Sequence, residues 1–228
     1  MTVNTSAQVS PRWEHPNMVA NFRESPPNQV LLAYAKGLRT ADTQQVLDLG
    51  CGAARNALPL ARLGYHVVGT DLSVPMIEAA RHRAKEEGPD ENIEFLVAPM
   101  TLLPLETGRF DLVVAHGIWN LARSDSEFRH ALSEAARVAR PGAHLFVFTF
   151  SRYTLPSHCE PMAGETLIFT QFQGEPQCFL TEEQLVEELA RVGFLRDSSG
   201  PLTEYNRPML PRTLAGPPVI YEGTFVRS

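Results

Sequence analysis

Apolar residues along the chain fall into short blocks, and the spacing within the blocks is of two kinds. Apolar runs without a helical period, at residues 46–49, 65–70, 93–97, 109–115 and 143–150, predict buried strands. The segments between several of these runs place apolar residues three and four positions apart, as amphipathic helices do. This alternation predicts an α/β fold with a mostly parallel sheet and helices on both faces.

Polar residues mark the starts of the predicted helices. A short amphipathic helix is expected over residues 28–38, and another follows residue 56 and is closed by Gly64. Three further helices are expected to begin at capping residues with supporting residues downstream: Ser73 (with Pro75 and Gly88), Ser124 (with Glu127) and Thr181 (with Gln184).

The pattern changes after residue 150. Two apolar segments, 166–172 and 177–180, flank Gly174-Glu175-Pro176 and predict a hairpin. Residues 194–196 and 219–226 predict the last two strands, and the proline-rich run 201–218 between them predicts an irregular loop.

A tight glycine turn connects the first predicted strand to a helix. The chain reads Asp48-Leu49-Gly50-Cys51-Gly52 at this point, and Asp71 ends the next strand. Glycines let a backbone approach a ligand closely, and a carboxylate about 20 residues further on is where a ribose diol would be held. Arg55 stands where a dinucleotide site would have its third glycine. The pattern therefore predicts a nucleoside ligand without phosphates.

Composition narrows the classes of function. A chain of 228 residues can form one sizeable core, and its net charge of −6 without a long basic run disfavours a nucleic-acid partner. Three cysteines without C-x-x-C spacing disfavour a disulfide framework and a zinc site, so no metal is expected. The first residues lack a leader pattern, and no apolar run reaches membrane length, so we expect a cytoplasmic protein.

The glycine turn and the end of the second strand resemble the first two motifs of class I S-adenosylmethionine-dependent methyltransferases. The matching residues are Asp48-Leu49-Gly50-Cys51-Gly52 and Gly69-Thr70-Asp71-Leu72-Ser73. The continuation Gly52-Ala53-Ala54-Arg55-Asn56 is similar to the turn of the tellurite-resistance group of small methyltransferases, with one extra residue. The resemblance covers roughly residues 29–150.

This resemblance implies a Rossmann-like sheet of seven strands whose last strand is antiparallel. It also implies S-adenosylmethionine as cofactor and S-adenosylhomocysteine as product. We expect one domain over residues 1–228, with a cofactor-binding core at 28–150 and a substrate-side insertion and last strands at 151–228. Residues 1–27 are either a mobile tail or an arm that closes over the cofactor as a lid.

The resemblance also suggests which residues contact the cofactor. Asp71 would hold the ribose, and Asp48 would organise the turn or meet the methionine ammonium group. Arg55 and Asn56 either contact the methionine carboxylate or only cap and pack the following helix. Many relatives have an acidic residue for the adenine amino group where this chain has Pro99. The remaining expected contacts are Gly50, Gly52, Leu72, Met100, Thr101 and His116.

His116 is the candidate general base, because it follows the fourth strand and imidazole titrates near neutral pH. The alternative is that it only covers the cofactor. The candidate contacts to the methyl acceptor are Trp13, Trp119, Tyr153 and His158. For Trp119 the alternative is packing inside the following loop, and for Tyr153 and His158 it is an ordinary loop role. A thiolate site for arsenite, suggested by Cys159 and Cys178, would need a third thiol on the acceptor side.

Taken together, these features predict a methyltransferase that acts on a small molecule by in-line transfer, as a monomer or a homodimer. Two alternatives stay open: a non-catalytic module that binds S-adenosylmethionine, and a methyltransferase for a protein or tRNA acceptor. The acceptor and the attacking atom (oxygen, nitrogen, sulfur or a chalcogen) are not predicted.

Overall fold

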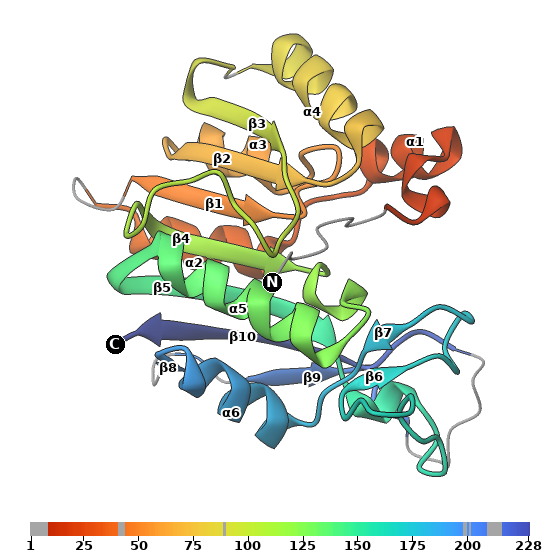
Figure 1. The fold of residues 1–228 in the computed structure, drawn as a ribbon. Helices are drawn as coiled ribbons and strands as arrows, with labels where there is room; N and C mark the ends of the chain where they lie inside the picture. The colour runs from red at the N-terminus through yellow and green to blue at the C-terminus, as the bar shows by residue number, and fades with distance from the viewer. Residues whose placement is uncertain (1–8, 41–43, 89, 198–199, 201, 209–215) are drawn as a thin grey trace, which may run out of the picture. The chain divides into compact units, whose positions relative to one another are not determined.

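The computed structural model describes residues 9–40, 44–88, 90–197, 200, 202–208 and 216–228. The chain divides into two compact units, Met1–Leu103 and Pro104–Ser228. The first unit contains the glycine turn, and the second contains the last strands (Figure 1). The expected single domain stays a prediction.

In the described part of the first unit, parallel strands form a sheet in the order β3-β2-β1. Their bounds are Gln45–Leu49 for β1, His66–Asp71 for β2 and Ile93–Val97 for β3. Val46, Leu47 and Leu49 are fully buried, as expected for a strand covered on both faces. All three predicted strands of this part of the chain are confirmed, within one residue at each end.

The expected helices of the first unit, over residues 28–38, after residue 56 and after Ser73, are present. The described helices of this unit are α1 (Pro16–Glu24), α2 (Gln29–Leu38), α3 (Ala57–Arg62) and α4 (Val74–Glu87), with 3₁₀ turns η1 (Pro11–Glu14) and η2 (Asp90–Asn92). The Ser73 side chain accepts a hydrogen bond from the backbone N–H of Met76 and so caps α4. Gly88, just past the end of α4, has a φ of 51°.

The described part of the N-terminal arm, residues 9–27, is helical and packs within the first unit. The rings of Trp13 and Phe22 meet edge to face with centroids 5.6 Å apart. The Ser73 hydroxyl donates to the Trp13 carbonyl at 3.1 Å, which ties η1 to the start of α4. This hydrogen bond holds the arm against the start of α4, while residues 1–8 lie outside the described part of the chain.

The second unit has a mixed sheet. Its main strands are β4 (Phe110–His116), β5 (Ala139–Phe150), β8 (Phe194–Arg196), β9 (Thr203–Tyr205) and β10 (Ile220–Arg227). Strands β4 and β5 are parallel, whereas β10 is antiparallel to β5, β8 and β9. The α/β class and the antiparallel last strand are therefore confirmed.

The described residues of the second unit include the helices α5 (Asp125–Val138) and α6 (Glu182–Arg191) and the 3₁₀ turns η3 (Trp119–Leu121) and η4 (Arg152–Thr154). Thr181 and Gln184 form a complete capping box at α6, as predicted. Ser124 caps α5, but the Glu127 carboxylate accepts from the backbone N–H of Arg123, so the second half of the predicted box is shifted by one residue.

Two predictions for this unit were wrong. The fifth strand was expected over residues 143–150, but β5 already begins at Ala139 and so includes Arg140-Pro141-Gly142. A register shift between Phe110 and Leu112 accommodates the extra residues, and Gly142 has a φ of 76°. The run 201–218 was expected to be irregular throughout, yet residues 203–205 form β9, because β10 offers them a sheet edge.

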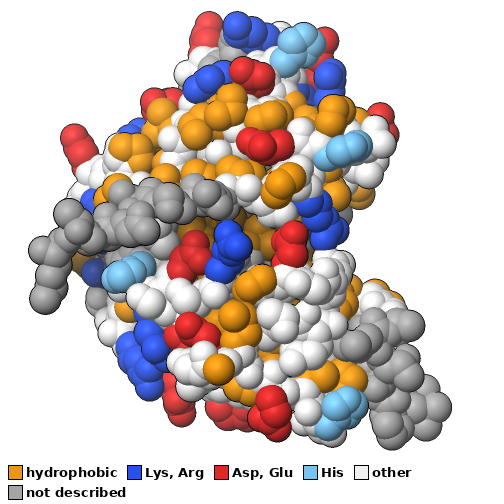
Figure 2. All heavy atoms as spheres, turned by 45° about the vertical axis from the view of Figure 1, so that its right-hand side comes forward, with side chains coloured by type: hydrophobic (Ala, Val, Ile, Leu, Met, Phe, Trp, Pro, Cys, Tyr) orange, Lys and Arg blue, Asp and Glu red, His pale blue; other side chains and the backbone are white. Residues whose placement is uncertain are grey.

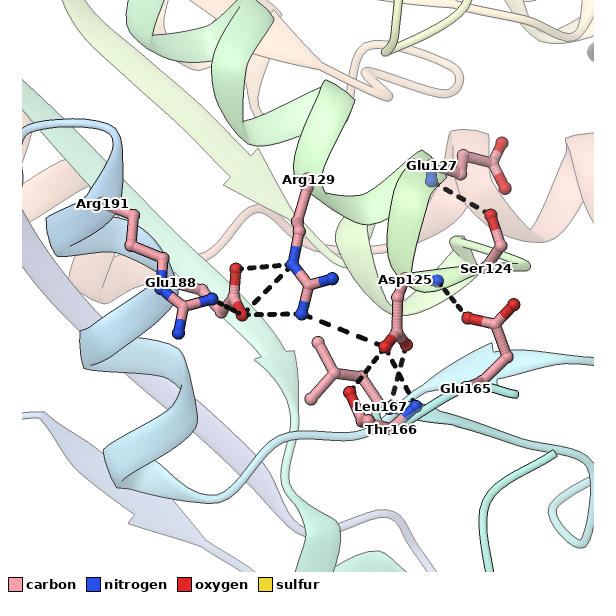
Figure 3. A network of polar contacts seen from close by, with 9 residues as sticks. All are labelled: Ser124, Asp125, Glu127, Arg129, Glu165, Thr166, Leu167, Glu188 and Arg191. Atoms are coloured by element: carbon pink, nitrogen blue, oxygen red, sulfur yellow. Dashed lines mark hydrogen bonds and ion pairs between the residues drawn. The ribbon is translucent and has the colours of Figure 1, made fainter. Parts of the chain in front are cut away.

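The predicted hairpin is confirmed, with shorter strands, β6 (Ile168–Phe169) and β7 (Gln177–Cys178). Polar contacts attach this insertion to the helices (Figure 3). The Asp125 carboxylate accepts from the backbone N–H groups of Thr166 (2.9 Å) and Leu167 (3.0 Å). Arg129 pairs with Glu188 of α6 at 3.0 Å, so one network links the insertion, α5 and α6.

Figure 2 shows basic side chains scattered among acidic ones on the described part of one face, without a basic stripe. Within the described residues, no helix combines the length and the apolar character needed to span a membrane.

Candidate functional site

The glycine turn after β1 has the backbone shape that its glycines require. Gly50 and Gly52 have φ values of 66° and 52°, in the left-handed region. The backbone N–H of Cys51 donates to the Thr70 carbonyl at 2.9 Å, so the turn lies at the end of β2. A Cβ atom on Gly52 would stand 3.1 Å from the Phe22 ring. The turn is therefore a close cradle of backbone at the carboxyl edge of the sheet.

Ala54 was not singled out by the sequence. Ala54 is fully buried, and its φ of 63° lies in the left-handed region. This backbone conformation is unfavourable for a residue with a Cβ atom. Ala54 belongs to the stretch that is one residue longer than in the family resemblance.

Asp71 ends β2 beside this turn. Its carboxylate accepts hydrogen bonds from the backbone N–H groups of Gly52 (3.0 Å) and Ser73 (2.8 Å). Burial raises the pKa of Asp71, while these N–H groups lower it. The carboxylate is thus fixed in orientation at the edge of the sheet and keeps lone pairs for further donors.

Asp48 lies one strand away and is almost completely buried, at 2% exposure. Its Oδ2 atom has no hydrogen-bond partner among the described residues. Burial raises the pKa of Asp48 to about 7, although the positive charge of Arg55 acts in the opposite direction. A buried carboxylate oxygen without a donor favours a ligand that brings a positive charge or an N–H group.

The two residues after the turn have different surroundings. The Arg55 guanidinium lies 5.9 Å from the Phe22 ring centroid and interacts electrostatically with Asp48. The Asn56 side chain is buried, and its Oδ1 accepts from the backbone N–H of Asn28 at 3.0 Å. For Asn56 this contact favours the packing alternative.

Residues expected near the adenine follow β3. The backbone N–H of Ala98 donates to the Asp71 carbonyl at 3.0 Å, and a turn from Pro99 to Leu102 follows. Met100 and Thr101, both half-buried, lie in this turn. Leu72 is also half-buried, directly after Asp71. The first unit thus brings its expected cofactor residues to one edge of its sheet.

His116 and Trp119 follow one another in the second unit but have different environments. His116 ends β4, and its ring stacks on Phe148 with centroids 4.1 Å apart and an angle of 8° between the planes. Trp119 is 1% exposed and packs edge to face on Phe128. Such burial favours the packing role for Trp119 over stacking on an acceptor.

The other two candidates of this unit lie at its surface. Tyr153 is 44% exposed, and the Arg207 guanidinium lies 3.3 Å from its ring centroid. His158 is exposed in the loop that follows η4. Two buried polar residues of the second unit, Asn120 and Glu222, were not among the predicted site residues, because local sequence spacing does not reveal burial.

Comparison with known proteins identifies the family. Residues 46–142 match a family described as "Methyltransferase domain". A demethylmenaquinone methyltransferase of Streptomyces avermitilis is 33% identical over 176 residues, which cover 70% of this chain and 72% of that protein. The chain belongs to the S-adenosylmethionine-dependent methyltransferases.

Two further matches set the extent of this likeness. The demethylmenaquinone methyltransferase of Clavibacter sepedonicus is 34% identical over 114 residues, covering 50% of this methyltransferase and 44% of the relative. The chain spans about half the length of several curated relatives that it matches. A crystal structure of a methyltransferase from Methanosarcina mazei aligns with a TM-score of 0.68 and 23% identity, over 89% of this chain and 99% of that one, and so shows the fold.

The residues at the sheet edge of the first unit fit the family's cofactor. S-adenosylmethionine carries an ammonium group and a ribose diol, and the unpaired Asp48 oxygen and the fixed Asp71 carboxylate are suitable partners for these groups. The expectations of the family and of its cofactor are confirmed. The narrower likeness to the tellurite-resistance group stays a prediction.

The cysteines of this methyltransferase are all buried and free. Burial raises the pKa values of the Cys51 and Cys178 thiols well above the ordinary range, which makes thiolates unfavourable there. Within the part of the chain that the structure describes, no group of three His, Cys, Asp or Glu side chains could hold a metal ion. These surroundings do not favour a thiolate site for arsenite.

Proposed function

We propose that the chain transfers a methyl group from S-adenosylmethionine to a small-molecule acceptor. The observation that carries this proposal is the pair of carboxylates beside the glycine turn of a chain from this family, the buried Asp48 and the half-buried Asp71. Asp71 would accept from the ribose hydroxyls, and Asp48 would pair with the ammonium group. Backbone at Gly50 and Gly52 would approach the ligand closely.

The other cofactor contacts in this proposal surround those groups. Leu72, Met100 and Thr101 would contact the adenosine part, with backbone N–H groups near the ring because Pro99 offers no side-chain acceptor. Arg55 would pair with the methionine carboxylate. Asn56 would instead support the turn through its hydrogen bond to Asn28.

The acceptor class proposed is a hydroxylated aromatic ring of the quinol type. This rests on the relatives named demethylmenaquinone methyltransferases, which are about one third identical over the matched residues. A quinol ring can be methylated at carbon as well as at oxygen. Carbon is therefore added to the attacking atoms left open above, which were oxygen, nitrogen, sulfur or a chalcogen.

The chemistry asks little of the protein beyond positioning. When bound, S-adenosylmethionine supplies an electrophilic methyl group on a sulfonium centre. We assign His116 to take the proton that the acceptor loses when it gains the methyl group. Trp13, Tyr153 and His158 remain proposed acceptor contacts. The protein is proposed to act in the cytoplasm as a monomer or a homodimer.

The test is a turnover assay that measures S-adenosylhomocysteine by mass spectrometry. Wild type, Asp71→Ala and His116→Ala would be incubated with reduced demethylmenaquinone, or with catechol, thiol and tRNA controls. We expect turnover with the quinol, loss of cofactor binding in Asp71→Ala, and cofactor binding with at least tenfold slower turnover in His116→Ala. Cofactor binding without turnover of any acceptor would indicate a non-catalytic module instead.

A further inference from the structure

One row of side chains crosses three strands of the second unit. His116 on β4 is opposite Phe148 on β5, and Phe148 is opposite Glu222 on β10. Residues directly opposite on neighbouring strands project to the same face of a sheet. The 4.1 Å stacking of His116 on Phe148 agrees with this placement. An imidazole and a carboxylate therefore flank one aromatic ring on one face.

A tyrosine extends this row beyond Glu222. Tyr205 on β9 is opposite Ile220, which lies two residues before Glu222 and so on the same face. The Tyr205 hydroxyl donates to Glu222 Oε1 at 2.9 Å. Tyr205 is 38% exposed, whereas Glu222 is 4% exposed. The pair thus joins a buried carboxylate to a phenol that reaches the surface.

The row lies where α/β proteins bind ligands. His116 is the last residue of β4, and the start of the antiparallel β10 adjoins the carboxyl end of β5, since Ile220 is opposite Phe150. Ligands of open α/β sheets bind beyond the carboxyl ends of the parallel strands. A buried carboxylate is costly for stability, and its occurrence at such an edge points to a functional role.

Asn120 provides an independent indication of a ligand at this edge. Its side chain is 3% exposed, and its Oδ1 atom has no hydrogen-bond partner among the described residues. That atom lies 4.0 Å from the position that a Cβ on Gly117 would take, directly after His116. A buried carbonyl oxygen without a donor is unfavourable unless a ligand supplies one.

We propose that Tyr205 and Glu222 are specificity-determining residues for the acceptor, which they recognise through a hydroxyl group on its planar aromatic ring. His116 and Phe148 form the neighbouring part of this acceptor subsite. This inference rests on the proposed function. Beyond the proposed function, the inference names the residues of this chain that select the acceptor and the chemical group on the acceptor that they recognise.

The selectivity follows from hydrogen-bonding capacity. The Tyr205 proton is committed to Glu222, and the Thr203 hydroxyl also hydrogen-bonds to the Tyr205 oxygen, so the pair can interact with a ligand by accepting hydrogen bonds rather than by donating them. Asn120 Oδ1 also offers an acceptor. A ring that carries a hydroxyl donor can satisfy this set, whereas the same ring with a methoxy group cannot. The half-buried Phe148 supplies an apolar surface for the ring.

The test compares two ligands that differ only in this donor. 1-Naphthol and 1-methoxynaphthalene would be titrated calorimetrically into the protein in the presence of S-adenosylhomocysteine. We expect wild type to bind the naphthol about tenfold more tightly, as one good hydrogen bond allows. Tyr205→Phe and Glu222→Gln should each lose most of this preference and keep their affinity for S-adenosylhomocysteine.

A matched control comes from the same strand. Tyr221 adjoins Glu222 on β10 but projects to the opposite face, is 2% exposed, and hydrogen-bonds through its hydroxyl to Ser151. Tyr221→Phe should leave the tenfold preference unchanged.

Three results would overturn the inference: equal affinity of wild type for the two naphthalenes, binding of neither, or a preference that persists in both variants. The proposed function fails separately, through absent cofactor binding or absent turnover of the quinol. Turnover together with equal naphthalene affinities would refute the inference alone.

Discussion

Replacing Asp48 with asparagine should stabilise the ligand-free protein at alkaline pH. The carboxyl group is 2% exposed, its Oδ2 has no partner among the described residues, and burial raises its pKa to about 7. Its ordinary pKa in the unfolded chain is 3.8. The folded state therefore keeps the proton to higher pH than the unfolded state, so ionisation of Asp48 lowers stability as pH rises from 4 to 7.

The size of the effect follows from the shift in pKa. A shift of roughly three units corresponds to about 4 kcal/mol in the free energy of unfolding once both states are ionised. At pH 5 about 2 kcal/mol of this cost is already present. Asp48→Asn should therefore stabilise the protein by about 2–3 kcal/mol more at pH 8 than at pH 5. Taking this difference between two pH values removes contributions of the amide that do not depend on pH.

Urea denaturation of wild type and Asp48→Asn at pH 5 and pH 8 measures this difference directly. Asp111→Asn is the matched control, because Asp111 is also buried, at 3% exposure, but pairs with Arg140 at 2.6 Å. That variant should be destabilised at pH 8. If Asp48→Asn gives the same change in stability at both pH values, the account of an unfavourably buried Asp48 carboxylate is wrong.

Three further predictions concern single residues. Ala54→Gly should raise the free energy of unfolding by about 1 kcal/mol in urea denaturation, because Ala54 has a φ of 63°; no gain would contradict the left-handed conformation. Gly52→Ala should weaken S-adenosylhomocysteine binding at least tenfold in calorimetry, since its Cβ would stand 3.1 Å from Phe22, and an unchanged Kd would argue against the cradle. Asp125→Ala should cost about 2–4 kcal/mol at pH 7, because it leaves the N–H of Leu167 without its carboxylate acceptor. Burial raises the pKa of Asp125, but hydrogen bonds from Thr166 and Leu167 lower it more, so its pKa in the folded state lies below the ordinary value. The cost of Asp125→Ala should therefore shrink below about pH 4, and a cost that does not depend on pH would contradict this prediction.

The parts of the fold that depend on local signals were predictable from the sequence. The caps at Ser73 and Thr181 located α4 and α6, and the apolar run at 93–97 located β3. The start of β5 and the existence of β9 depend on pairing with partners distant in sequence, which a local pattern does not contain.

The same division applies to the candidate site. Asp48 and Asp71 follow from two short sequence motifs, and the structure shows both at the sheet edge of the first unit. The row of His116, Phe148 and Glu222 exists only through strand register, so no spacing along the chain reveals it. The burial of Trp119 depends on tertiary packing, so the sequence alone could not decide between a packing role and contact with the acceptor.

The most direct test of the central claim is calorimetric titration of S-adenosylhomocysteine into wild type and Asp71→Ala. The account predicts micromolar binding to wild type and a Kd at least a hundredfold weaker in the variant, because the carboxylate that would hold the ribose hydroxyls is lost. Equal affinities of the two proteins would contradict the account.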